Sequence, residues 1–145
     1  MIKKKLCAIL GAEFFSCKEE KILYELTVRS AFEAAHLIEG YKGKCSRLHG
    51  HNWNIEAVVR GAELDSLGML VDFKILKAEL NKVLDAFDHR FLNELETFAR
   101  ENPTAENLAR KIFKKLAASE IFSGTTKLYA VKVFETPGSC VTYYE

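Results

Sequence analysis

Long apolar runs, proline and an excess of charge of one sign are rare or absent in this chain of 145 residues. It has 2 prolines, and 21 basic against 20 acidic residues leave a formal net charge of +1. A nearly neutral chain has no overall field that would attract nucleic acid or an anionic membrane. No apolar run approaches the roughly 18 to 20 residues that span a bilayer. We therefore expect neither nucleic acid nor a membrane as a partner.

Cysteine is also scarce, because 4 unevenly placed residues cannot form a dense disulfide framework. Hydrophobic residues make up 48% of the chain, which excludes a disordered protein and is enough for a core. Three lysines precede the apolar stretch Leu6–Leu10, but no cleavage signal follows it. We expect a cytoplasmic protein with reduced thiols, in which residues 1–21 form a poorly ordered extension and residues 22–145 a single domain.

Alternation of apolar and polar residues predicts two strands in the first half of the chain. The inward face of the first strand holds Tyr24, Leu26, Val28, Ser30 and Phe32. The inward face of the second holds Trp53, Ile55, Ala57 and Val59. Its outward face holds Asn54, Glu56 and Arg60.

Helical spacing predicts two helices in the second half, the first with Asp72 as its N-cap and the second beginning at Pro103–Thr104. The apolar stripe of the first is Phe73, Leu76, Leu80, Val83, Leu84 and Phe87. That of the second is Ala105, Leu108, Ala109, Ile112, Phe113 and Leu116. A third strand, in which Tyr129, Val131 and Val133 share a face, and a short closing strand from Val141 to Tyr144 follow. This order, β-β-α-α-β-β, predicts an α+β fold with both helices on one face of an antiparallel sheet.

Three histidines share the inward phase of the first two strands. His49 and His51 are in phase with Trp53, and His36 is in phase with Phe32. Residues two apart in a strand point to the same side, so all three imidazoles should face inward. His36 alone could be a core histidine with one backbone partner, but three neutral imidazoles together are typical of a zinc site with an open fourth position.

Two further residues near these strand ends have alternative interpretations. Cys45 lies four residues before His49, and it could be a fourth ligand that closes a structural site or a nearby thiolate that acts as a base. Glu135 shares the face of Val133. It is either at a frayed strand end or a carboxylate that holds a planar, guanidinium-like edge through two parallel hydrogen bonds.

Asp88–His89 directly follows the first predicted helix. The pair could be a proton relay, or His89 could simply interact with the helix C-terminus. Thr104 is most simply an N-cap, and Glu106 a favourable acid in the first helical turn. The other cysteines, Cys7, Cys17 and Cys140, show no ligand spacing and receive no role.

Several motifs in a fixed order cover the chain from about Leu26 to Tyr143. They are Phe32–His36, Cys45–His51, Gly68–Phe73, Asp88–His89, Leu92–Asn93, Pro103–Asn107 and Glu135–Thr136. Together they resemble the 6-pyruvoyl-tetrahydropterin synthase family. The short Cys-x-x-x-His-Gly-His spacing most closely resembles its 6-carboxy-tetrahydropterin synthase branch.

The resemblance implies a tunnelling fold (T-fold) that oligomerises into a barrel, as a homohexamer built from a dimer of trimers with intersubunit active sites. It implies Zn2+ on His36, His49 and His51, and Cys45 as the catalytic thiolate. Asp88 and His89 would form a partner dyad. Glu135, Thr104 and Glu106 would contact the pterin.

The resemblance also implies the reaction. A zinc-dependent lyase would convert 7,8-dihydroneopterin triphosphate to 6-carboxy-5,6,7,8-tetrahydropterin, with release of acetaldehyde and triphosphate, on the route to queuosine and other 7-deazaguanines. One alternative is a 6-pyruvoyl-tetrahydropterin synthase, which eliminates triphosphate only. Another is a zinc-stabilised pterin-binding or assembly protein without turnover.

Overall fold

The computed structural model describes residues 24–145, so the extension predicted over residues 1–21, with Cys7 and Cys17, lies outside the described residues. The main elements are β1 (Tyr24–His36), β2 (His49–Gly61), α1 (Phe73–Leu84), β3 (Arg90–Phe91), α2 (Ala105–Ala117), β4 (Lys127–Thr136) and β5 (Ser139–Tyr143). Short 3₁₀ turns occupy Lys44–Ser46, Leu92–Glu94 and Glu96–Phe98. The predicted order is confirmed, with the two-residue strand β3 added between the helices.

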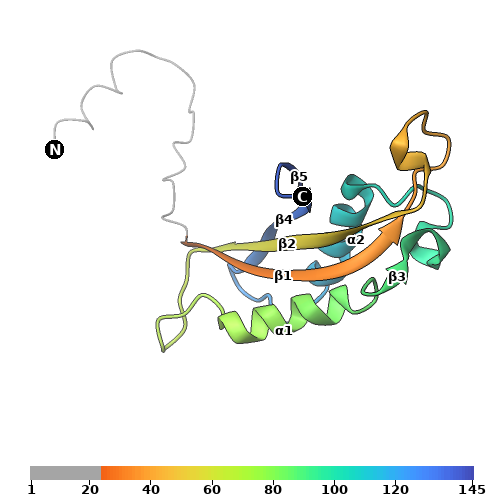
Figure 1. The fold of residues 1–145 in the computed structure, drawn as a ribbon. Coiled ribbons are helices and arrows are strands. Elements are labelled where there is room, and N and C mark those ends of the chain that lie inside the picture. Colours follow the sequence, from red (N-terminus) through yellow and green to blue (C-terminus); the bar gives the residue numbers. More distant parts are fainter. Residues whose placement is uncertain (1–23) are drawn as a thin grey trace, which may run out of the picture.

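One sheet carries the described fold, with strand order β3-β1-β2-β4-β5. All neighbouring strands are antiparallel except β3, which runs parallel to β1. β1 and β2 form a long curved ribbon, and α1 and α2 lie on the same side of the sheet (Figure 1). The loop between β1 and β2, residues 37–48, projects beyond the end of this ribbon (Figure 1).

The core lies between the two helices and the inward face of the sheet. Its fully buried members include Trp53, Ile55, Leu76, Leu80, Leu108, Ile112, Leu116 and Val131. Each buried leucine or isoleucine contributes roughly 1.5 to 3 kcal/mol relative to an exposed one. Both predicted N-caps are present, because Asp72 Oδ1 accepts a hydrogen bond from Lys74 N at 2.6 Å and Thr104 Oγ1 accepts one from Asn107 N at 3.3 Å.

Within residues 24–145, none of the helices has the length and apolar character that crossing a bilayer requires.

Three side chains predicted to face inward are exposed, and one of them, Tyr24, is 47% exposed at the first residue of β1. A bulge where β4 pairs with Val58 and Val59 of β2 shifts the strand phase, so Leu128 takes the core position and Tyr129 points away from it. The Tyr129 ring stacks on Tyr144 instead, and the Arg60 guanidinium carbon lies 3.3 Å from its centroid. Phe73, at the first position of α1, is 58% exposed, because the helix turns its buried side to the sheet only from Leu76 onward.

Glu56 is an outward-facing side chain that is nevertheless buried. It lies on the outward face of β2, as predicted, yet it is only 7% exposed. Arg29 of β1 covers it at 2.7 Å and Lys132 of β4 at 3.3 Å, so an ion-paired cluster buries the carboxylate. Strand alternation shows which face a side chain occupies, but it does not show what neighbouring strands place over it.

Candidate metal centre and adjoining cavity

The pairing of β1 with β2 brings the three predicted histidines together. His36 lies directly opposite His49, and His51 is opposite Ala34, so all three project from the same face of the ribbon. Their ring centroids are 4.5 Å (His36–His49), 5.2 Å (His36–His51) and 4.9 Å (His49–His51) apart. The Trp53 ring packs beneath them, 5.1 Å from His36 and 5.2 Å from His51. The fully buried Trp53 side chain therefore forms an apolar surface beneath the cluster.

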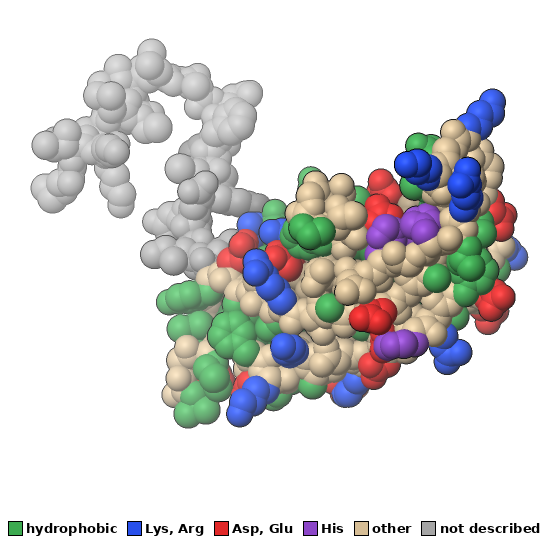
Figure 2. Space-filling view, in the orientation of Figure 1, with side chains coloured by type: hydrophobic (Ala, Val, Ile, Leu, Met, Phe, Trp, Pro, Cys, Tyr) green, Lys and Arg blue, Asp and Glu red, His purple; other side chains and the backbone are tan. Residues whose placement is uncertain are grey.

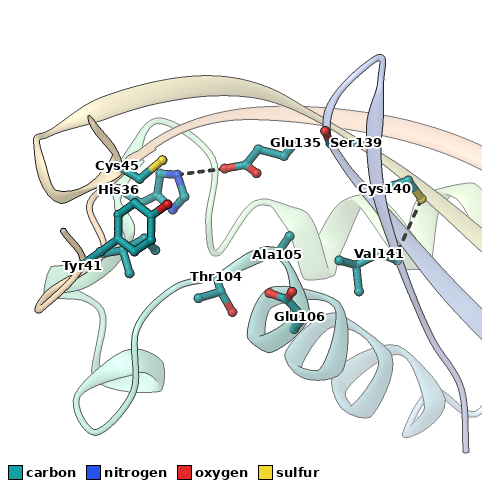
Figure 3. A pocket seen from close by; sticks show the side chains of 11 residues that line it. His36, Tyr41, Cys45, Thr104, Ala105, Glu106, Glu135, Ser139, Cys140 and Val141 are labelled. Atoms are coloured by element: carbon teal, nitrogen blue, oxygen red, sulfur yellow. Dashed lines mark hydrogen bonds and ion pairs between the residues drawn. The ribbon is translucent and has the colours of Figure 1, made fainter. Parts of the chain in front are cut away.

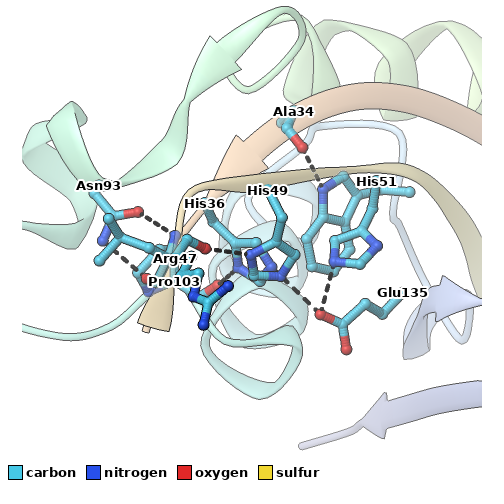
Figure 4. A network of polar contacts seen from close by, with 10 residues as sticks. Ala34, His36, Arg47, His49, His51, Asn93, Pro103 and Glu135 are labelled. Atoms are coloured by element: carbon cyan, nitrogen blue, oxygen red, sulfur yellow. Dashed lines mark hydrogen bonds and ion pairs between the residues drawn. The ribbon is translucent and has the colours of Figure 1, made fainter. Parts of the chain in front are cut away.

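Backbone carbonyls orient two of these imidazoles. His36 Nδ1 lies 2.8 Å from Pro103 O, and His49 Nδ1 lies 2.7 Å from Arg47 O (Figure 4). A neutral imidazole that donates from Nδ1 has its lone pair on Nε2. Such second-shell carbonyls are the usual means of fixing a metal-binding tautomer. Both rings are thus prepared to offer Nε2 as a ligand atom.

Glu135 joins the three histidines. Its Oε1 lies 3.3 Å from His36 Nε2 and 3.1 Å from His51 Nε2 (Figure 4). One ligand atom from each of the four residues lies within 4.8 Å of every other. Nε2 of His36 and of His51 are buried without a hydrogen-bond partner. Buried polar atoms are rarely left unpaired, so these orphaned nitrogens around a carboxylate fit a cation with nitrogen and oxygen ligands, such as zinc.

The protonation of the cluster agrees with this interpretation. Burial lowers the pKa of His36 and of His51 below the ordinary histidine value, because the charged imidazolium loses its hydration. The Pro103 carbonyl opposes that effect at His36, and the Glu135 carboxylate opposes it at His51. Metal binding requires neutral imidazoles, which this environment favours near neutral pH.

A cavity of about 500 Å³ adjoins the cluster, within the size range of small-molecule sites. Its walls include His36 and Glu135 from the cluster and three other residues singled out in the sequence: Cys45, Thr104 and Glu106 (Figure 3). Cys45 is a free, exposed thiol on the 3₁₀ turn Lys44–Ser46. Among the described residues, it is not a member of the group that could hold a metal.

Other lining residues were not predicted. Tyr41 and Ile38 belong to the β1–β2 loop, whereas Ser139, Cys140 and Val141 belong to β5. Cys140, which had no role in the sequence analysis, is a second free thiol in the wall, on the side opposite Cys45 (Figure 3). Only the pairing of β4 with β5 brings Cys140 here, and no sequence spacing indicates it.

Two asparagines fasten the β1–β2 loop, and sequence reasoning gave neither a role. Asn93 Oδ1 accepts from Leu37 N at 3.0 Å, and its Nδ2 donates to Leu37 O at 3.0 Å. Asn102 makes the same pair of bonds to Glu39, at 2.8 Å and 3.1 Å. Each side-chain amide therefore mimics a neighbouring strand and fixes the base of the loop that carries Cys45.

The structure separates the Asp88–His89 pair from Cys45. His89 lines a different hollow, together with Glu33, Asn52 and His51, and it is not part of the wall that holds Cys45. α1 ends at Leu84, and the backbone N–H of Asp88 donates to Leu84 O at 3.0 Å, so Asp88 contacts the helix C-terminus, whereas the His89 N–H donates to Glu33 O of β1. His51 lines this second hollow and also belongs to the metal group, so the two hollows meet at the cluster.

Close contacts hold the pair in place. His89 Nδ1 lies 3.0 Å from Asp88 Oδ1, which raises the pKa of His89 above its ordinary value. The backbone N–H of Glu33 donates to Asp88 Oδ1 at 3.0 Å, and this bond, followed by the contact with His89, lowers the pKa of Asp88. His89 has a φ of +53°, a conformation uncommon for residues other than glycine, and its N–H donates to Glu33 O at 2.6 Å. The arrangement favours a charged, exposed imidazolium that can give up a proton.

The loop of residues 37–48 adds local positive charge. Lys42, Lys44 and Arg47 lie on it, and each is exposed. Blue side chains gather on this projecting loop beside the purple histidines (Figure 2). The chain has almost no net charge, so an anion near the metal group would meet a positive field made locally by this loop.

Comparisons with known proteins agree with this geometry. The family model for 6-pyruvoyl tetrahydropterin synthase matches residues 25–145. A 6-carboxy-5,6,7,8-tetrahydropterin synthase from Synechocystis is 37% identical over 119 residues, covering 79% of this chain and 88% of that protein. One from Rickettsia typhi is 34% identical over 135 residues, covering 79% and 95%.

A solved structure is also similar. The Caenorhabditis elegans 6-pyruvoyl tetrahydropterin synthase superposes with a TM-score of 0.76 at 33% identity, covering 86% of this chain and 96% of that one. This likeness confirms the predicted T-fold of the subunit.

Proposed function

Because the chain belongs to the 6-pyruvoyl tetrahydropterin synthase family, we propose that it is a cytoplasmic, zinc-dependent 6-carboxy-tetrahydropterin synthase. It takes 7,8-dihydroneopterin triphosphate and water to 6-carboxy-5,6,7,8-tetrahydropterin, acetaldehyde and triphosphate, an early step toward queuosine. The bonds that break are the C–O bond to triphosphate and one carbon–carbon bond of the side chain. The observation that supports this best is that a free Cys45 lines the same cavity as His36 and Glu135, two members of the group that could hold a metal.

His36, His49 and His51 hold the zinc, and Glu135, Thr104 and Glu106 bind the pterin. The bound metal supplies a Lewis acid next to the substrate side chain. The Glu135 carboxylate accepts two parallel hydrogen bonds from the guanidinium-like edge of the ring, which fixes the plane of the substrate. Lys42, Lys44 and Arg47 on the neighbouring loop bind the triphosphate.

Cys45 removes a proton from the substrate side chain, and its place in the cavity wall but outside the metal group supports this role. Asp88 and His89 supply the second proton-transfer group, with Asp88 holding the imidazole. Since Cys45 does not line the hollow that holds His89, we propose that the dyad completes the site of a neighbouring subunit in a homohexamer built as a dimer of trimers.

The two free thiols of the cavity provide the test. Cys45→Ala is expected to lower turnover by roughly 10²- to 10⁴-fold, the usual contribution of a proton-transfer group, while zinc content stays at the wild-type value. Cys140→Ala removes a thiol from the opposite wall and should retain activity. The assay measures acetaldehyde, triphosphate and carboxy-pterin from purified protein. An active Cys45→Ala variant would refute the role of this thiol, and a zinc-loaded wild type that yields no carboxy-pterin would refute the reaction.

Two alternatives give different results in the same assay. The likeness to the nematode structure favours a 6-pyruvoyl-tetrahydropterin synthase as the second candidate. That enzyme would release triphosphate and a pyruvoyl-pterin, without acetaldehyde. A zinc-stabilised binding or assembly protein would show no turnover, and Cys45→Ala would then lower zinc content and thermal stability.

A further inference from the structure

We propose that Glu135 alternates between two partners: it is a fourth ligand of the metal when no pterin is bound, and it leaves the metal to hold the pterin when substrate enters. This inference rests on the proposed function and concerns how access to the metal is regulated in the same site. Under this proposal, the fourth coordination position of the metal becomes free for the substrate only when the pterin ring is bound.

The distances around Glu135 support its role as a metal ligand. In a tetrahedral zinc site with bonds of about 2.0 to 2.1 Å, neighbouring ligand atoms lie roughly 3.3 to 3.4 Å apart. Glu135 Oε1 lies 3.3 Å from His36 Nε2 and 3.1 Å from His51 Nε2, close to this spacing. The carboxylate oxygen therefore occupies the place of a ligand relative to two of the three histidines.

The hydrogen bonding of His36 supports the same position. Its Nδ1 donates to Pro103 O, so a neutral ring presents the lone pair of Nε2 to Glu135 Oε1. Two acceptors that face each other at this distance repel unless a cation lies between them. His36 Nε2 has no hydrogen-bond partner, which agrees with a metal as its partner.

Glu135 cannot bind the pterin and the metal at the same time. Holding a guanidinium-like edge through two parallel hydrogen bonds uses both carboxylate oxygens, and Oε1 cannot do so while it lies between two imidazoles. Glu135 also has room to move, because its side chain is 31% exposed and lines the cavity. The β4–β5 pairing passes from Phe134–Cys140 to Thr136–Ser139, which leaves Glu135 unpaired in a bulge.

Zinc affinity, measured by competition with a chromophoric chelator, tests the inference without turnover. Glu135→Gln keeps the size of the side chain but removes its charge, and it should weaken zinc binding by roughly tenfold or more. Glu106→Gln is the matched control, since Glu106 lines the same cavity outside the metal group, and its zinc affinity should equal that of wild type. Glu135→Asp retains a carboxylate and should recover part of the loss. Equal affinity in wild type and Glu135→Gln would overturn the inference.

The movement of Glu135 from the metal to the pterin is tested with unsubstituted pterin, a bicyclic compound that has the guanidinium-like edge but no side chain that could bind the metal. Saturating pterin should weaken zinc binding to the wild type by about the factor that Glu135→Gln produces, because the two binding events are linked. In Co2+-substituted protein, the visible absorption bands should shift on addition of pterin in the wild type. If pterin leaves the wild-type zinc affinity and the bands unchanged, the exchange is refuted. A protein that passes these tests but forms no carboxy-pterin would refute the proposed function and leave the exchange in place.

Discussion

Mixing two inactive variants tests where the active site is completed. Cys45→Ala removes the thiol from one cavity wall, and His89→Ala removes the imidazole from the other hollow. Each variant alone should be inactive under the proposed function. If Cys45 of one subunit works with His89 of its neighbour, hybrid oligomers of the two variants contain sites in which both residues are intact.

The size of the recovery follows from this arrangement. In an equal, random mixture, a given cavity has an intact Cys45 in about one half of cases, and the facing neighbour has an intact His89 in about one half. About one quarter of the sites are therefore complete, and the mixture should show about one quarter of wild-type activity. A site completed within one subunit would recover nothing, because every subunit carries one of the two defects.

The assay needs subunit exchange and a matched control. Both chains are co-expressed with different tags, hybrids are purified over both tags, and acetaldehyde release is measured. Cys45→Ala mixed with Glu135→Gln is the control, because these residues line the same cavity of one subunit and every cavity then has a defect. Activity of the Cys45→Ala and His89→Ala hybrids at the level of this control would refute the intersubunit site. Size-exclusion chromatography with light scattering that shows a stable monomer would refute it as well.

Two further predictions concern the dyad and the core. Asp88 raises the pKa of His89, whereas the Glu33 N–H, followed by His89, lowers the pKa of Asp88. The interaction between the two side chains therefore stabilises the fold mainly between about pH 4 and pH 6.5. It fades as pH rises through the folded pKa of His89 or falls through that of Asp88. Asp88→Asn should therefore lower the pKa of His89 toward its ordinary value in an NMR titration, and an unchanged titration would contradict the assignment. Leu108→Ala, at a fully buried position of α2, should lower the free energy of unfolding by about 2 to 5 kcal/mol in urea. The control Leu67→Ala, at a position 78% exposed, should change it by less than about 0.5 kcal/mol, and similar losses for both would contradict the core.

Much of the fold could be predicted because its elements carry strong periodic signals. The alternation in β1 and β2 and the stripes of the two helices each depend on one face meeting the core, which local sequence records directly. The failures have a common physical cause. Tyr129 was predicted to face inward because a bulge cannot be seen in the alternation of β4 alone. Glu56 lies on the outward face as predicted, but its burial could not be foreseen because Arg29 and Lys132 reach it from other strands.

Some residues of the candidate site could be predicted from the sequence, and others could not. The three histidines could be grouped from their phase, because two lie on one strand and the third ends the strand predicted beside it. Cys140, Asn93 and Asn102 could not be found, since their places depend on hairpin pairing and on loops that meet across the fold. Glu135 was recognised as unusual, but its contact with His36 and His51 could not be foreseen, because it requires the register between strands distant in sequence.

That register is also the reason metal binding should depend on the whole sheet. A slip of one residue between β1 and β2 would move His36 away from His49 and turn its imidazole to the other face. A slip between β2 and β4 would do the same to Glu135, which stays in phase with Val131 and Val133 because the bulge at Val58–Val59 lies on the far side of those residues. The donor set therefore exists only when three strands pair correctly. Since metal would bind the folded register and not its alternatives, binding should favour that register by mass action, and the same strands that form the core would be held in place by the site at their ends.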